Sequence, residues 1–238
     1  MNSQKKIENG PKKICCNICD DVGFIEVETK DGIRYRPCKC REMLKVQKIW
    51  EQSGISVNDI DKSFSNFETW NIQIRDMKDK ATSYYRQFEK IKGERPNSIM
   101  LCGNPGCGKT HLALALANNL LKNKHIPVVY MPYRDVITKI KQNMVDEDYY
   151  KKTLNKYQNA EVLLIDDLFK GKVNDTDINI MFELINYRYL NRLPMIISTE
   201  FTVDKLLSFD EAIGSRLYEM AKAYVSEIKG SNNNYRMR

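Results

Sequence analysis

One eight-residue run constrains the fold of this chain more than any other feature. The run is GNPGCGKT, from Gly103 to Thr110, and it matches the pattern G-x-x-x-x-G-K-[ST] of a phosphate-binding loop. Its glycines let the backbone turn tightly, so that successive N–H groups can point at the phosphates of a nucleotide. The Lys109 ammonium can then reach the β- and γ-phosphates, and the Thr110 hydroxyl can ligate Mg²⁺.

The flanks of this loop support the same interpretation. Residues 98–102 read as a buried strand and residues 111–121 as a helix with an apolar face, which is the strand–loop–helix context that the pattern requires. A chance glycine-rich turn would need neither flank. We therefore expect nucleotide contacts from the loop and the residue after it: Gly103, Asn104, Pro105, Gly106, Cys107, Gly108, Lys109, Thr110 and His111.

Length, hydropathy and charge narrow the setting. The chain has 238 residues, enough for one medium domain with a small appendage or for two small domains. No apolar run approaches the roughly 18 residues of a membrane span, and the polar start of the chain does not resemble a secretory signal. We therefore expect a cytoplasmic protein. The net charge of +7 suits a polyanionic partner without identifying one.

Strand and helix patterns alternate beyond residue 71. Strands are predicted at 98–102, 127–131, 162–165, 194–198 and 223–228, and helices at 72–91, 111–121, 134–144, 147–158, 177–190, 203–207 and 211–221. The strands are apolar throughout, so we expect an α/β fold with a mainly parallel sheet covered on both faces. The helix at 72–91 is expected to bury Ile72, Met77, Tyr84, Phe88 and Ile91, and the helix at 177–190 to bury Ile178, Met181, Leu184, Ile185 and Tyr189.

The chain divides into four predicted segments. These are a disordered tail at 1–13, a cysteine-rich module at 14–53 that ends in a helix at 42–53, a linker at 54–71 and the nucleotide-binding domain at 72–238. The linker carries Phe64 and Phe67. These rings either anchor the linker on the next domain or contact the nucleotide on its base side.

A second piece of nucleotide chemistry follows the strand at 162–165. That strand ends in Asp166 and Asp167, the Walker-B pattern, which would place Asp166 beside the phosphate-binding loop to hold Mg²⁺ through water. Asp167 would then orient or activate the attacking water. A turn or helix cap is the structural alternative, because Asp favours both.

Two further candidates lie downstream. The strand at 195–198 ends in Ser198-Thr199-Glu200, and Thr199 or Glu200 can sense the γ-phosphate if this strand lies between the two strands that carry the earlier motifs. Arg216 begins a short helix and can act as an arginine finger on the nucleotide of a neighbouring subunit. The alternatives are an ordinary polar strand end and a surface arginine paired with Glu211 or Glu219.

Five of the seven cysteines lie within the first 40 residues. In a reducing compartment this clustering favours a metal over disulfides. The pairs Cys16-x₂-Cys19 and Cys38-x-Cys40 flank a predicted strand–turn–strand segment, so a hairpin would bring four thiolates together as a structural Zn²⁺ site. Cys15 is an alternative to Cys16 as ligand.

Basic residues are frequent from Lys30 to Lys48, where seven stand against two acids. With Phe24 and Tyr35 interleaved, this segment is either a nucleic-acid or partner surface or simply a solvated basic face.

Taken together, these motifs resemble the AAA+ ATPases of the bacterial and phage helicase-loader family, the DnaC/DnaI type, including its transposition relative IstB. The resemblance covers nearly the whole chain. CNICDDVGFIEV with RYRPCKC resembles the zinc-binding module of the DnaI-like branch, and GNPGCGKTHLALALAN, LLIDDL, FELINYRYLNRLPMIIST and DEAIGSRLYEM resemble the ATPase core in its expected order.

The resemblance implies a switch ATPase with ATP, Mg²⁺ and Zn²⁺ that binds a replicative hexameric helicase and places it on single-stranded DNA. It implies that Asp167 activates water and that Arg216 acts between self-associating ATPase domains. Glu200 departs from the family, which commonly has Asn at that position, so either Thr199 takes the sensing role or phosphate sensing is weakened. The resemblance further implies that the zinc module faces the helicase and that Arg236 is a candidate nucleotide contact. Because the sequence stops soon after the last predicted strand, we expect no helical lid domain.

Three other functions compete with the loader. An IstB-type transposition helper shares the core motifs, but the cysteine module argues against it. A P-loop kinase for a small molecule would need an acceptor pocket, whereas the paired Asp166 and Asp167 favour water as acceptor. A zinc adapter without enzymatic activity would not need the Walker motifs.

Overall fold

The computed structural model describes residues 16–29, 32–44, 59, 61–230 and 233–237. The chain forms two compact units, Met1–Lys45 and Val46–Arg238. Several expectations fall outside the described residues: the tail at 1–13, Cys15, Lys30, Lys45, Lys48, most of the linker before residue 61 and the part of the predicted helix beyond residue 44.

The first unit contains the predicted hairpin. Strands β1 (Phe24–Thr29) and β2 (Gly32–Pro37) pair antiparallel, with Phe24 opposite Pro37. The Cys38 N–H continues the pairing by donating to the Gly23 carbonyl at 2.8 Å. The hairpin therefore brings the chain that precedes β1 next to the chain that follows β2.

The second unit contains a five-stranded sheet in the order β4-β5-β6-β3-β7, parallel at every pairing. Its strands are β3 (Ile99–Gly103), β4 (Val128–Pro132), β5 (Val162–Leu168), β6 (Met195–Thr199) and β7 (Val225–Ile228). Its helices are α3 (Ile72–Ile91), α4 (Lys109–Lys124), α5 (Tyr133–Gln142), α6 (Glu147–Gln158), α7 (Asp175–Leu190), α8 (Val203–Phe209) and α9 (Glu211–Ala221), and a 3₁₀ helix, η2, spans Tyr235–Met237. The predicted α/β class is confirmed.

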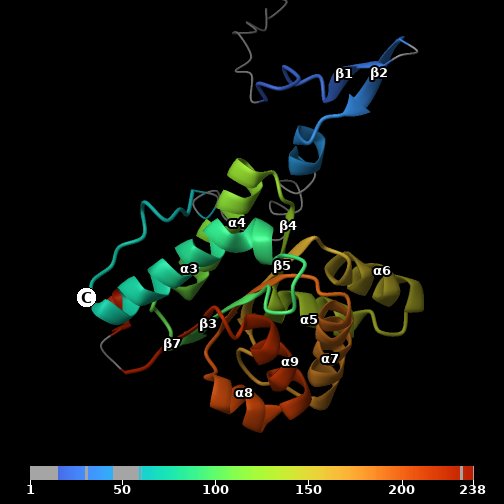
Figure 1. Ribbon diagram of the computed structural model, residues 1–238. Helices are drawn as coiled ribbons and strands as arrows, with labels where there is room; N and C mark the ends of the chain where they lie inside the picture. The colour runs from blue at the N-terminus through green and yellow to red at the C-terminus, as the bar shows by residue number, and fades with distance from the viewer. Residues whose placement is uncertain (1–15, 30–31, 45–58, 60, 231–232, 238) are drawn as a thin grey trace, which may run out of the picture. The chain divides into compact units, whose positions relative to one another are not determined.

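The helices form a layer on each face of the sheet (Figure 1). Helices α3 and α4 lie on one face, and α5 to α9 lie on the other. Successive residues of a strand pack against opposite helix layers. Leu163 and Ile165 pack in the core with residues of α5, α7 and α9, while Leu164 points to the opposite face. Burial on both faces is the reason that the strands are continuous apolar runs.

Two helix faces differ from the prediction. In α3 the buried stripe is Ile74, Met77, Ala81, Tyr84 and Phe88, whereas Ile72 is 76% exposed and Ile91 is partly exposed. The Asn71 side chain caps α3 by accepting from the Ile74 N–H, so Ile72 lies in the first turn, off the stripe.

In α7 the buried face also differs from the predicted one. Ile180 and Arg188 are buried, while Ile178 and Tyr189 are only partly buried. Met181, Leu184 and Ile185 are buried as expected. None of the helices in the described ranges combines the length and apolarity that crossing a membrane requires.

Candidate nucleotide site and cysteine cluster

The phosphate-binding loop joins β3 to α4, as its pattern predicts. Lys109 is buried, and its Nζ donates to the carbonyl oxygens of Gly103 at 2.8 Å and Asn104 at 3.0 Å. Gly108 caps α4 in the left-handed region with φ 93°, and a Cβ there would lie 2.6 Å from the Phe67 ring. The loop thus has an ammonium and a helix N-terminus at one place, both of which favour an anion.

Asp166 lies at the carboxyl end of β5 and accepts three hydrogen bonds. Thr110 Oγ1 donates to its Oδ1 at 2.9 Å, the Ser198 hydroxyl donates to the same oxygen, and Tyr130 donates to Oδ2 at 3.1 Å. Burial raises the pKa of Asp166, while the bonds from Ser198 and Thr110 oppose that rise. An oxygen-rich pair such as Thr110 and Asp166 fits a hard cation such as Mg²⁺.

Asp167 has a left-handed backbone, with φ 56°, and its N–H donates to the Ser198 hydroxyl at 2.8 Å. Its Oδ2 lies 2.7 Å from Lys170 Nζ, which is also 3.4 Å from Glu200 Oε1. The hydrogen bond to Asp167 is the main reason that the pKa of Lys170 is raised. Asp167 therefore lies beside Asp166 but carries its own ion pair.

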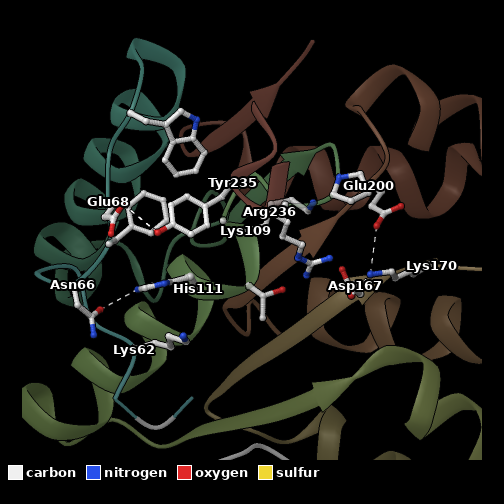
Figure 2. Close-up of a pocket in the computed structure, with 16 residues that line it drawn as sticks. Lys62, Asn66, Glu68, Lys109, His111, Asp167, Lys170, Glu200, Tyr235 and Arg236 are labelled. Atoms are coloured by element: carbon white, nitrogen blue, oxygen red, sulfur yellow. Dashed lines mark hydrogen bonds and ion pairs between the residues drawn. The ribbon is translucent and has the colours of Figure 1, made fainter. Parts of the chain in front are cut away.

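A cavity of about 440 Å³ opens beside these groups, within the size range of small-ligand sites. Figure 2 shows that its walls come from the linker, the phosphate-binding loop, the loop after β5 and the C-terminal η2. The predicted site residues among its walls are Pro105, Gly106, Gly108, Lys109, Thr110, His111 and Asp167. Gly103, Asn104 and Cys107 are not among the residues that line it.

The far end of the cavity is aromatic and joins two distant segments. Trp70 lies 5.3 Å from the Tyr235 ring and 6.5 Å from the Phe67 ring, measured between centroids. The Tyr235 N–H donates to the Gly106 carbonyl at 3.0 Å, which attaches η2 to the phosphate-binding loop. Phe67 both packs on Gly108 and lines the cavity, whereas Phe64 packs against Tyr85.

His111 lines the cavity but also holds the linker. Its Nε2 lies 3.0 Å from Asn66 Oδ1 and 3.2 Å from the Ser63 carbonyl oxygen, and its ring meets the Phe67 ring edge-on. Burial lowers the pKa of His111, which favours the neutral imidazole.

Sequence reasoning missed several cavity residues. Lys62, Asn66, Glu68, Trp70 and Lys170 were not among the predicted contacts. The one available signal was the unusual density of aromatic residues in the linker. Arg236, which the resemblance suggested, extends from η2 into the cavity.

Thr199 and Arg216 are not brought to the cavity of their own chain. The Thr199 hydroxyl is buried, donates to the Leu168 carbonyl at 2.9 Å and accepts from the Phe201 N–H at 3.1 Å. Arg216 lies on α9, where its guanidinium donates to Asn186 Oδ1 at 3.0 Å and to the Ala212 carbonyl at 2.6 Å. The residue of β6 that contacts the Walker-B carboxylate, Asp166, is Ser198.

The four predicted thiols of the first unit converge. The sulfur atoms of Cys16, Cys19, Cys38 and Cys40 all lie within 4.8 Å of one another. Neighbouring sulfurs are 3.4 to 3.8 Å apart, close to the spacing that a tetrahedral site with metal–sulfur bonds of about 2.3 Å requires. The four thiols therefore fit Zn²⁺, with Cys16 in the place for which Cys15 was the alternative.

Comparison with known proteins agrees with the fold. The chain is 36% identical to the phage-like element PBSX protein XkdC of Bacillus subtilis over 236 residues, covering 96% of this chain and 88% of XkdC. It is 40% identical to the uncharacterized protein YqaM of the same organism over 202 residues, which cover 82% of this chain but only 64% of YqaM.

The crystal structure of the DnaC helicase loader has a similar fold, with a TM-score of 0.64 and 24% identity over 73% of this chain and all of that one. The predicted parallel α/β fold is thereby confirmed. Residues 40–238 match the family model described as IstB-like ATP binding protein. This chain belongs to that family of ATP-binding proteins.

Proposed function

We propose that this chain is an ATPase that loads a replicative hexameric helicase onto single-stranded DNA, with ATP hydrolysis as its switch. The observation that carries the proposal is the four-thiol cluster at Cys16–Cys40, because most of it precedes residues 40–238, the segment that matches the ATP-binding family. In this proposal the cysteine module binds the helicase, and the ATP or ADP bound to the ATPase domain decides when the helicase is held or released. Such a role belongs to the cytoplasm.

Different residues of the second unit bind ATP, hold Mg²⁺ and activate the attacking water. Lys109 and the loop N–H groups bind the phosphates, Thr110 and Asp166 hold Mg²⁺, and the aromatic end of the cavity accepts the base. Bound Mg²⁺ would neutralise phosphate charge. Asp167 orients and deprotonates the attacking water, and Arg236 supplies a second cation from η2.

Arg216 acts on the nucleotide of a neighbouring copy. Its position on α9, away from the residues that line its own chain's cavity, supports this role. Self-association of ATPase domains would then make hydrolysis depend on assembly. Thr199 does not contact phosphate in this proposal. Its hydroxyl donates to the Leu168 carbonyl and so fixes the end of β5 relative to β6.

A second candidate is an IstB-type helper of transposition, which the family match itself favours. It predicts ATP-dependent assembly on duplex DNA with a transposase. The small-molecule kinase has less support, because the paired Asp166 and Asp167 favour water as the acceptor.

The decisive experiment is a pull-down of the host's replicative helicase by the full chain, with and without ATP. We expect capture by the wild type to depend on nucleotide state, and capture to be lost in a zinc-depleted Cys38→Ser variant. A Lys109→Ala variant should capture helicase without responding to ATP. Equal helicase binding by the metal-free protein would exclude the adapter role, and retention of a transposase in place of helicase would favour the second candidate.

A further inference from the structure

Lys170 lies between two carboxylates at the edge of the cavity (Figure 2). Its Nζ is 2.7 Å from Asp167 Oδ2 and 3.4 Å from Glu200 Oε1, and all three residues line the same cavity. The ammonium thus has a nearer and a farther acceptor, and a small rotation of a flexible side chain exchanges them.

The backbone builds this arrangement. The Lys170 N–H donates to the Asp167 carbonyl at 3.0 Å, and both Asp167 and Phe169 have positive φ. The resulting tight turn places the Lys170 side chain over the carboxylate three residues earlier. Phe169 is buried against Tyr133 and Phe209, which holds the turn in place.

The geometry of this pair opposes the role proposed for Asp167. A carboxylate that takes a proton from water needs an oxygen that is free to face that water, and the Lys170 ammonium occupies one of the two oxygens of Asp167, Oδ2, at 2.7 Å. The side chains of Lys170, Asp167 and Glu200 are 43%, 31% and 30% exposed, so the pair can exchange without a large desolvation cost.

We propose that Lys170 is a positioning residue that restrains Asp167, and that Glu200 is the alternative acceptor to which Lys170 transfers when hydrolysis proceeds. The inference rests on the proposed function, because it takes Asp167 as the residue that activates water. It also assigns a role to Glu200, which stands where the loader family commonly has Asn.

The test is steady-state hydrolysis of Mg²⁺–ATP by the full chain, resolved into kcat and KM. Lys170→Met should raise kcat roughly two- to fivefold, the range of an exposed ion pair, with KM little changed. Glu200→Gln should lower kcat, because Lys170 then stays on Asp167. The double variant should behave like Lys170→Met, and Lys170→Arg should keep the low rate.

Lys172→Met is the matched control, since Lys172 is exposed two residues away and does not line the cavity. Affinity for a non-hydrolysable ATP analogue checks that each variant is folded. A fall in kcat for both Lys170→Met and Glu200→Gln would overturn the restraint and indicate contact with phosphate. If neither wild type nor Lys170→Met hydrolyses ATP, the proposed ATPase fails as well; if only the expected acceleration is absent, the restraint alone fails.

Discussion

Thr110 Oγ1 donates a hydrogen bond to Oδ1 of Asp166 at 2.9 Å and so joins the first turn of α4 to β5. Two more donors, Ser198 and Tyr130, fix the same carboxylate from β6 and β4. The strand order explains the convergence, because β6 lies between β3 and β5 and the carboxyl ends of parallel strands share one edge. The residues that would hold Mg²⁺ are therefore already in place around the phosphate-binding loop.

Replacing Lys109 by Ala should abolish tight nucleotide binding. The ammonium is buried and oriented by two loop carbonyls, so its loss removes a charge-assisted contact to phosphate and leaves those carbonyls without their donor. Such a contact is worth about 1.5–3 kcal/mol, or roughly a 10- to 150-fold loss of affinity. Titration with a fluorescent ATP analogue measures it. Lys152→Ala, on the exposed side of α6, should bind normally; an unchanged affinity in Lys109→Ala would mean that the cavity does not bind phosphate there.

Zinc should be present at one ion per chain and should depend on Cys38. The four sulfurs already have tetrahedral spacing, and so small a hairpin has little core of its own, so metal binding would supply much of its folding energy. We expect Cys38→Ser to lose the metal, as measured by elemental analysis, while the second unit keeps its ATP binding. Cys102→Ala, in the buried strand β3, should retain full zinc content. Stoichiometric zinc in Cys38→Ser would show that the cluster is not the site.

The fold was largely predictable because its signals are local. Five apolar runs with helical segments between them indicate a parallel sheet, and each predicted strand and helix of the second unit is present within a few residues. Errors arose where burial depends on the exact start of a helix, as at Ile72, or on distant partners, as at Arg188.

The candidate site was only half predictable. The phosphate end is one continuous run of sequence, whereas the opposite end joins Trp70 to Tyr235, whose contact depends on how the linker and the C-terminal segment pack on the loop. Lys170 is close to Asp167 in sequence, but its direction follows from two positive φ angles that no local pattern indicated. A charged residue in such a turn ordinarily faces solvent.

Arg188 should prove essential for stability rather than for catalysis. It is fully buried in α7 and donates to the carbonyls of Tyr157, Gln158, Ala160 and Pro194 at 2.7 to 3.0 Å. Arg188→Met leaves those acceptors unsatisfied and should lower the free energy of unfolding by about 3–5 kcal/mol. The urea midpoint should fall with an unchanged slope. Arg86→Met, on the exposed side of α3, is the matched control; a midpoint equal to wild type in Arg188→Met would show that water replaces the guanidinium.

Arg216 should act in trans. Within its own chain the guanidinium is held by Asn186 and Ala212 and lies 5.1 Å from the Phe182 ring centroid, among residues that do not line the cavity. Arg216→Ala should therefore bind ATP normally but lose hydrolysis by roughly 10³-fold or more, the usual effect of removing an arginine finger.

Mixing Arg216→Ala with Asp167→Asn, each inactive alone, should restore part of the activity, because one mixed interface in the assembly pairs an intact arginine with an intact aspartate. Hydrolysis by wild type should also rise faster than linearly with protein concentration. Full activity in monomeric Arg216→Ala, or no recovery on mixing two variants that still associate, would place the stimulating charge elsewhere, with Arg236 of the same chain as the next residue to replace.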